Sequence, residues 1–184
     1  MQPPSPRSPA QGRDAGWCLR ANRLGHWNGV RRFFCTISRW GDGVFWYALM
    51  AAMVVVDGMT GLAASAHLAA TGLIALILYK ALKRWTRRPR PFASDVRIRA
   101  WVAPLDEFSF PSGHTLHAVA FSIVAIGHYP ILALLLVPFT GCVAVSRVVL
   151  GLHYPSDVLA AICIGGGLAA TSLWLLPGVE LFAI

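Results

Sequence analysis

The chain has 184 residues, of which 56% are hydrophobic and only 13% are charged, and its formal net charge is +8. Soluble domains carry about 25% charged residues, so this composition excludes an ordinary soluble globular protein. The apolar residues lie in long runs separated by short polar segments, which favours one compact membrane domain with several spans.

Residues 1–22 are predicted to form a disordered N-terminal tail, and residues 23–184 the membrane-embedded domain. The chain begins MQPPSPRSPAQGRDAG, a stretch rich in Pro, Ser, Gln and Gly with no apolar run. Such a composition is typical of disorder, and the stretch lacks the apolar region of a secretory signal peptide.

From about Leu24 to Trp40, aromatic and aliphatic residues recur at helical spacing, and Arg31, Arg32 and Arg39 interrupt them. This pattern predicts a basic amphipathic helix that lies in the membrane interface. An irregular linker is the alternative interpretation. A membrane-spanning helix is disfavoured, because Arg31 and Arg32 at its centre would cost about 2.5 kcal/mol or more each.

Five candidate transmembrane helices follow, with bounds near Val44–Val56, Gly61–Leu82, Gly113–Gly127, Ile131–Leu150 and Pro155–Leu176. Spans need about 20 residues, so the first and third must include flanking residues or lie where the bilayer is thin. The predicted fold is therefore an all-α integral-membrane bundle of about five transmembrane helices plus the N-terminal interfacial helix.

Polar clusters stand at the ends of these spans, and alternating crossings place them on one membrane face. The clusters are Lys83 to Pro91, Phe110 to His114, and Ser146 to Asp157. Polar residues at such positions are expensive and usually functional. Among them, Arg90 and Arg147 offer planar forks suited to phosphate oxygens, and Lys83 adds a point charge.

The starts of two spans reinforce this preference for an anion. Ser112 is expected to cap the third span, and Gly113 lets a ligand approach the backbone closely. Pro155 suits the first turn of the last span. Two helix N-termini that face one site attract an anion, so we predict phosphate binding there.

Histidines in the same clusters are candidates for the chemistry. His153 and Asp157 lie four residues apart, close enough for the carboxylate to accept the Nδ1 proton and leave Nε2 free. His114 is then the proton carrier for the leaving group. His117, one helical turn further on, is interpreted as a residue that supports His114, and His67 as a hydrogen-bonding residue inside the bundle.

Each of these residues also has a structural interpretation. The arginines can serve as positive-inside topology markers, and this is the preferred interpretation of Arg84, Arg87 and Arg88. A lone histidine at a span end can be a packing residue, and Asp157 can complement its helix dipole. The convergence of three separate segments with phosphate-binding chemistry on one face favours a functional site.

The three clusters resemble the tripartite signature of the type 2 phosphatidic acid phosphatases, which is shared with vanadium haloperoxidases and glucose-6-phosphatase. Lys83, six residues and then Arg90-Pro91 resembles the first motif, and Pro111-Ser112-Gly113-His114 the second. Ser146-Arg147, five residues, His153, three residues and Asp157 resembles the third. The resemblance extends from about Gly43 to Leu176.

The resemblance implies a role for each motif residue. His153 would attack phosphorus, Asp157 would orient it, and His114 would protonate the leaving alkoxide and then activate water. The equatorial oxygens would be held by Lys83, Arg90, Ser112, Gly113 and Arg147. No metal or other cofactor is expected. Many integral members resemble six-span bundles, whereas five spans are counted here; the missing span is N-terminal and would determine the side of the membrane on which the site opens.

The predicted function is hydrolysis of a membrane lipid phosphate or diphosphate, such as phosphatidate, phosphatidylglycerol phosphate or a polyprenyl diphosphate. A lipid phosphotransferase is the alternative. A transporter is disfavoured because its ionisable residues would gather at mid-membrane, and a haloperoxidase because those relatives resemble soluble proteins. The expected partners are the lipid substrate and the bilayer, with no nucleic acid, and the oligomeric state is left open.

All 16 Lys and Arg residues fall on the face that carries the clusters. The positive-inside rule places such a face in the cytoplasm. We therefore predict an integral protein of a bacterial inner membrane whose site faces the cytoplasm.

Overall fold

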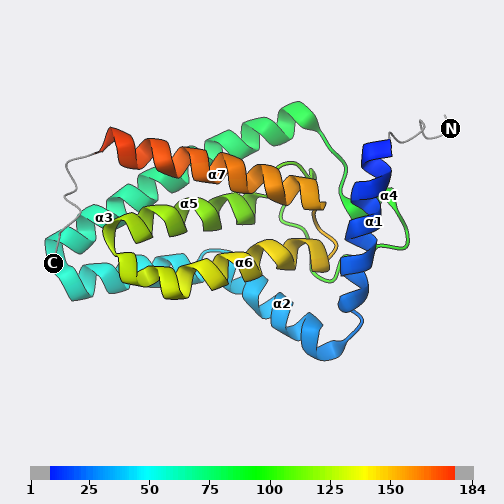
Figure 1. Cartoon of the computed structure of the whole chain (residues 1–184), viewed down its shortest axis with the longest axis horizontal. Helices are drawn as coiled ribbons and strands as arrows, with labels where there is room; N and C mark the ends of the chain where they lie inside the picture. The colour runs from blue at the N-terminus through cyan, green and yellow to red at the C-terminus, as the bar shows by residue number, and fades with distance from the viewer. Residues whose placement is uncertain (1–8, 177–184) are drawn as a thin grey trace.

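The structure, a computed structural model, describes residues 9–176, and within this range it consists of helices and loops without a strand. Figure 1 shows the long helices lying side by side, with α1 crossing one end of the bundle. The predicted all-α class is confirmed. The elements are α1 (Pro9–Leu24), α2 (Asn28–Gly41), α3 (Val44–Thr86), α4 (Pro91–Ser94), α5 (Gly113–His128), the 3-10 turn η1 (Pro130–Leu132), α6 (Ala133–Val149) and α7 (Pro155–Leu175).

Helix α3 contains two of the predicted spans, because the chain folds back on itself at Gly58 (Figure 1). Gly58 has φ 54° and ψ −121°, a conformation that a side chain would strain. The two arms pack tightly beyond the bend: a Cβ on Gly61 would lie 1.9 Å from the Met53 carbonyl oxygen. Ser65 Oγ also donates to the carbonyl of Met50 at 3.0 Å.

Within the described residues, three helical stretches are long and apolar enough to cross a membrane: 44–94, which includes the bend, 130–149 and 155–175. Helix α5 has 16 residues, fewer than the roughly 20 that a full span needs. The predicted count of five spans is therefore not confirmed as a count, although each predicted segment is helical.

Helix α5 is the central helix of the bundle and packs against α3, α6 and α7. The surrounding helices bury α5 along most of its length, and Leu116, Ala120 and Val124 are completely buried. Close approach of α7 depends on Gly165, where a Cβ would lie 2.6 Å from the Leu116 carbonyl oxygen. Because α5 and α7 both begin at the same end of the bundle, this packing brings the second and third motifs together.

The prediction of a disordered tail through residue 22 is wrong for residues 9–22, which belong to α1; residues 1–8 lie outside the described range. Contacts with the rest of the protein explain the order. Asn22 donates to the carbonyls of Arg99 and Val149 and accepts from the Arg99 amide, at 2.9–3.0 Å. Cys18 is completely buried, and burial raises the pKa of its thiol to about 12.

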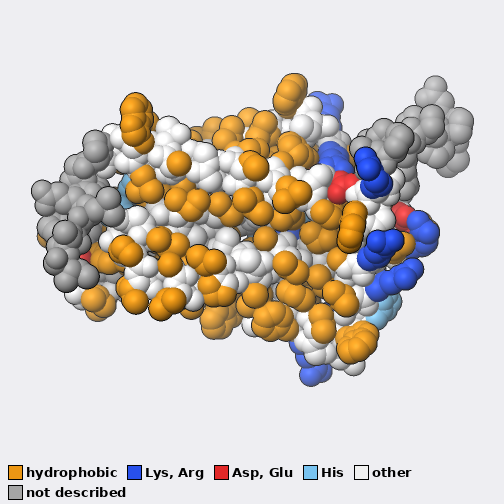
Figure 2. Space-filling view, viewed as in Figure 1, with side chains coloured by type: hydrophobic (Ala, Val, Ile, Leu, Met, Phe, Trp, Pro, Cys, Tyr) orange, Lys and Arg blue, Asp and Glu red, His pale blue; other side chains and the backbone are white. Residues whose placement is uncertain are grey.

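The segment predicted as either an amphipathic helix or an irregular linker is helical, and it forms α2. Large apolar side chains protrude from this segment. Trp27 directly precedes α2, Phe33 and Trp40 lie within it, and all three are more than half exposed. In Figure 2, Lys and Arg side chains gather at the end of the molecule where α1 lies, and hydrophobic side chains cover the long helices. This distribution is the one expected of a membrane bundle with a basic interfacial end.

Candidate active site

The three motifs meet at the basic end of the bundle, where a cavity of about 890 Å³ opens. Six of the eight predicted site residues line the cavity: Lys83, Arg90, Gly113, His114, Arg147 and His153. Asp157 and Ser112 lie behind it and are completely buried. The junction between α2 and α3 also lines the cavity, through Gly41, Asp42 and Gly43.

His153 presents its Nε2 atom to the cations of the cavity. Its Nδ1 lies 2.7 Å from the carbonyl oxygen of Ser109, which can only accept a hydrogen bond, so Nδ1 carries the proton. Nε2 therefore keeps its lone pair, and Arg90 Nη1 donates to it at 3.3 Å. Burial lowers the pKa of His153 to about 3, although the neighbouring Asp157 opposes this shift. The ring is neutral and nucleophilic at physiological pH.

Asp157 supports this histidine less directly than the sequence predicted. Its Oδ2 is 3.8 Å from Nδ1, beyond hydrogen-bond distance. The carboxylate instead accepts the Ser109 hydroxyl proton and the Tyr154 amide proton, the latter at 2.8 Å. Asp157 thus fixes the segment whose carbonyl orients His153. Sequence reasoning missed Ser109, although it lies two residues before the Pro-Ser-Gly-His motif.

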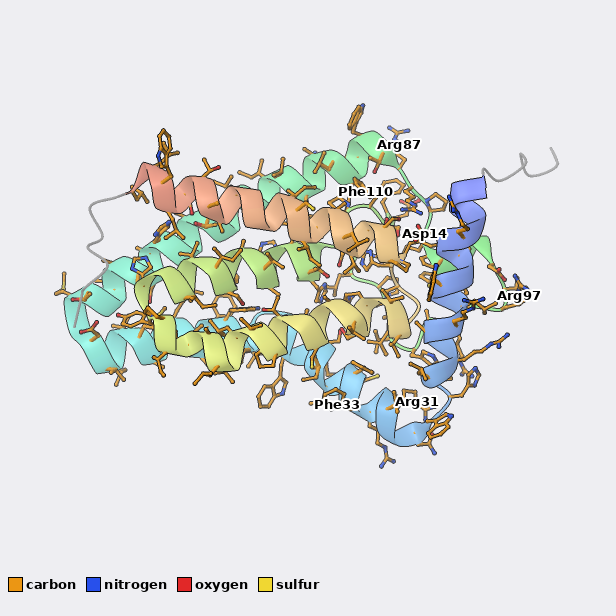
Figure 3. The ribbon with its side chains drawn as sticks, viewed as in Figure 1. Asp14, Arg31, Phe33, Arg87, Arg97 and Phe110 are labelled. Carbon is orange, nitrogen blue, oxygen red and sulfur yellow. The ribbon has the colours of Figure 1, made fainter. Side chains whose placement is uncertain are left out.

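Arg88 is part of this support, so its interpretation as a topology marker alone is wrong. It donates to Asp157 Oδ1 at 2.6 Å and to Asp14 Oδ2 at 2.6 Å. Asp14 also accepts from the amide of Ser156 at 3.2 Å. Figure 3 shows Asp14 between α1 and the start of α7. The N-terminal helix is therefore linked through two charged residues to the environment of His153.

Lys83 and Arg90 converge on a carboxylate that sequence reasoning did not identify. Lys83 Nζ lies 2.6 and 2.8 Å from the two oxygens of Asp106, and Arg90 Nη2 donates to Asp106 at 2.7 Å. Burial acts to raise the pKa of Asp106, but Lys83 and Arg90 outweigh it and hold the pKa below its usual value. A phosphate would compete with this carboxylate for the same two cations.

Arg147 and His114 face the cavity from α6 and α5, and each has a partner from the N-terminal segment. Arg147 Nη1 donates to the hydroxyl of Ser38, and its Nε has no partner within the described residues. His114 Nε2 is paired with Asp42. Neither Ser38 nor Asp42 was predicted as a site residue.

The remaining predicted residues have supporting geometry. Ser112 caps α5 as predicted, since its hydroxyl accepts from the Thr115 amide, and its own amide donates to the Asp157 carbonyl at 3.3 Å. The ring of His117 faces the carbonyls of Gly113 and Gly72 rather than His114. His67 lies inside the bundle, within 3.1–3.2 Å of His128 and Ser172, as expected.

The chemistry available in the cavity is nucleophilic attack on an anion held by fixed cations. Three buried cationic side chains line the same cavity as a neutral histidine whose unprotonated Nε2 faces Arg90, and a second histidine is available for proton transfer. Among residues 9–176, no group of three or more His, Cys, Asp or Glu side chains is placed to hold a metal ion.

The cavity continues from this polar end into an apolar groove along the two arms of α3. Its walls there are formed by Trp46, Met50, Ala69, Leu73 and Leu76. A groove of this kind can accept hydrocarbon while the charged part of the same molecule stays at the basic end.

Comparison with known proteins agrees with this arrangement. The family model of the PAP2 superfamily matches residues 63–179. Phosphatidylglycerophosphatase B of Escherichia coli is 40% identical over 74 residues, which are 37% of this chain and 29% of that protein. Decaprenylphosphoryl-5-phosphoribose phosphatase of Mycobacterium tuberculosis is 34% identical over 92 residues, 48% of each chain. These matches thus span less than half of either curated relative.

Solved structures share the fold over more of the chain. The transmembrane PAP2 type phosphatidylglycerolphosphate phosphatase of Bacillus subtilis superposes with a TM-score of 0.77 at 24% identity, covering 96% of this chain and 90% of that one. LpxE of Aquifex aeolicus gives 0.73 at 22% identity, covering 85% and 92%. With helices apolar enough to span a bilayer and a family model that matches most of its length, this chain is an integral membrane protein that belongs to the PAP2 superfamily.

Proposed function

We propose that this protein is a membrane lipid phosphatase that removes a phosphate through a phosphohistidine on His153, without a metal ion. The observation that carries the proposal is the buried neutral His153, whose Nε2 faces Arg90 in a cavity shared with Lys83, Arg147 and His114. The relatives named above support it, because their names describe phosphatases of lipid phosphates.

The reaction has two displacements at phosphorus. His153 Nε2 attacks, the bond from phosphorus to the ester oxygen breaks, and His114 gives its proton to the departing alkoxide. His114 then removes a proton from water, whose oxygen attacks the phosphohistidine and releases inorganic phosphate and neutral His153. Lys83, Arg90 and Arg147 stabilise the charge on the equatorial oxygens in both steps.

A lipid is the substrate class that fits the cavity. Its charged end holds the three cations, and the groove between the arms of α3 is lined by apolar side chains. A phosphate ester with a hydrocarbon tail can therefore keep the tail in the groove while the phosphate reaches His153. Phosphatidate, phosphatidylglycerol phosphate and polyprenyl diphosphates all satisfy this requirement.

The direct test is release of inorganic phosphate by the purified full-length protein in mixed micelles of glycerolipid and polyprenyl phosphates. We expect release from at least one of these lipids, with the same rate in EDTA, because the fixed cations take the place of a metal ion. Consumption of the lipid with transfer of the phosphate to another lipid would instead identify a phosphotransferase. Loss of activity in EDTA, restored by a divalent ion, would contradict the metal-free mechanism.

We further propose that the protein lies in a bacterial inner membrane with its active site on the cytoplasmic side. The described basic residues gather at the end that carries the cavity (Figure 2), and the positive-inside rule orients such an end inward. The basic helix α2 would also be attracted to the anionic cytoplasmic leaflet.

Cysteine labelling of intact bacterial cells tests this orientation. In a background without the four native cysteines, Val96→Cys reports on the loop at the cavity end and Met59→Cys on the bend at the opposite end, and both positions are well exposed. We expect an impermeant maleimide to label Met59→Cys and to label Val96→Cys only after lysis. Labelling of Val96→Cys but not Met59→Cys in intact cells would reverse the orientation.

A further inference from the structure

The end of α2 reaches two residues of the active site. Ser38 lies in the last turn of this helix, is buried, and accepts a hydrogen bond from Arg147 Nη1. Arg147 is itself 2% exposed and has no carboxylate partner in the described part of the chain. Ser38 is therefore the side chain that fixes how the guanidinium faces the cavity.

Asp42 makes the corresponding contact with His114. It directly follows α2, its amide donates to the Arg39 carbonyl at 3.2 Å, and its carboxylate is paired with His114 Nε2. A carboxylate acceptor fixes the orientation of an imidazole ring and stabilises the positive charge that the ring carries when it holds two protons. His114 must pass through that charged form in each half of the proposed reaction.

Close packing holds the end of α2 in this place. A Cβ on Gly41 would lie 3.2 Å from Val143 Cγ2 of α6, so the helix end lies directly on the helix that carries Arg147. Ser38 and Asp42 both precede residue 63, where the match to the family model begins. Each contact therefore joins a residue outside the matched region to one inside it.

We propose that the C-terminal end of α2 is a positioning element of the active site, in which Asp42 orients His114 and Ser38 orients Arg147. This inference rests on the proposed phosphatase function, since it assigns the two side chains to proton transfer and to phosphate binding respectively. It makes the N-terminal amphipathic helix part of the catalytic unit rather than only a membrane anchor.

For Asp42, the decisive measurement is the dependence on the leaving group in Asp42→Asn. The rate of formation of phosphohistidine from an alkyl phosphate lipid is expected to fall at least about 10-fold. The same rate with an aryl phosphate, whose leaving group needs no proton, is expected to stay within about 2-fold of wild type. In a His114→Ala background, Asp42→Asn is expected to cause no further loss, because Asp42 acts through His114.

For Ser38, the measurement is inhibition by vanadate, an anion that can adopt the five-coordinate geometry of phosphoryl transfer. Loss of a hydrogen bond to a charged group predicts that Ser38→Ala raises the vanadate inhibition constant about 10-fold. In an Arg147→Ala background the same substitution is expected to have no effect on inhibition. Thr36→Ala is the matched control for Ser38→Ala, since Thr36 is exposed on the same helix. The control for Asp42→Asn is Asp57→Asn, because Asp57 lies at the far end of the bundle.

Two results would overturn the inference while leaving the proposed function intact. One is an equal loss on alkyl and aryl substrates in Asp42→Asn, or a full additional loss in the His114→Ala background. The other is unchanged vanadate inhibition in Ser38→Ala. Failure of the proposed function itself would be recognised separately, as the absence of phosphate release by the wild-type protein.

Discussion

His153→Ala is expected to abolish turnover, because His153 is the one histidine among residues 9–176 whose Nε2 is seen to accept from Arg90 in the cavity. Removal of a covalent nucleophile lowers kcat by about 10³-fold or more. Any rate enhancement that remains comes from substrate binding and electrostatic stabilisation. The measurement is phosphate release, together with acid-labile, alkali-stable labelling of the protein by a ³²P-labelled substrate. Wild-type protein should show this labelling after a rapid quench, and the variant should not.

Folding must be controlled in this experiment, because His153 is 1% exposed and its removal leaves a small cavity. His153→Gln keeps a polar side chain of similar length and is expected to be equally inactive. His26→Ala, at an exposed position that does not line the cavity, should behave as wild type. Turnover at the wild-type rate by either His153 variant would eliminate the phosphohistidine mechanism.

His114→Ala is expected to separate the two halves of the reaction. With an alkyl phosphate lipid, formation of phosphohistidine should slow by about 10²–10⁴-fold, the usual contribution of a general acid. With an aryl phosphate, this first step should remain fast, because a phenolate leaves without a proton. Water activation would still be impaired, so the aryl substrate should give one rapid turnover and then leave phosphorylated protein.

Rapid-quench measurement of both products distinguishes this result from general damage to the site. The expected pattern is a burst of phenol equal to the amount of enzyme, followed by slow release of phosphate. The aryl substrate thus serves as an internal control for the integrity of His153 and the cations. An equal slowing of the first step for both substrates would show that His114 does not act as the proton donor.

The motif residues could be predicted to share one site because they stand at the ends of spans that must alternate across the membrane. Lys83, Arg90, His114, Arg147 and His153 do meet in one cavity. Neighbouring groups that hold them were not predictable, because those contacts depend on how loops and helix ends pack. Asp106 pairs with residues 16 and 23 positions away in the chain, and Asp14 with one 74 positions away.

Dependence on contacts between residues distant in sequence also explains why α1 was wrongly predicted to be disordered. Its sequence has few apolar residues, which indicates disorder when the segment is considered alone. Three contacts supply the missing stabilisation: Asp14 with Arg88, Cys18 against the loop at His153, and Asn22 with two backbone carbonyls. A helix whose order comes from partners distant in sequence leaves no periodic signal of its own.

The basic end of the molecule also bears on the traffic of lipids around it. Positive side chains there enrich anionic headgroups in the surrounding leaflet, within about 8 Å at physiological salt. A phosphorylated lipid is therefore concentrated near the mouth of the cavity, and the dephosphorylated lipid, which carries less negative charge, is concentrated less. The difference in headgroup charge therefore favours replacement of product by substrate at the cavity. Substrates of the proposed reaction accumulate there by lateral diffusion in the leaflet, and products diffuse away. Raising the ionic strength should weaken this recruitment while leaving the chemistry inside the cavity unchanged.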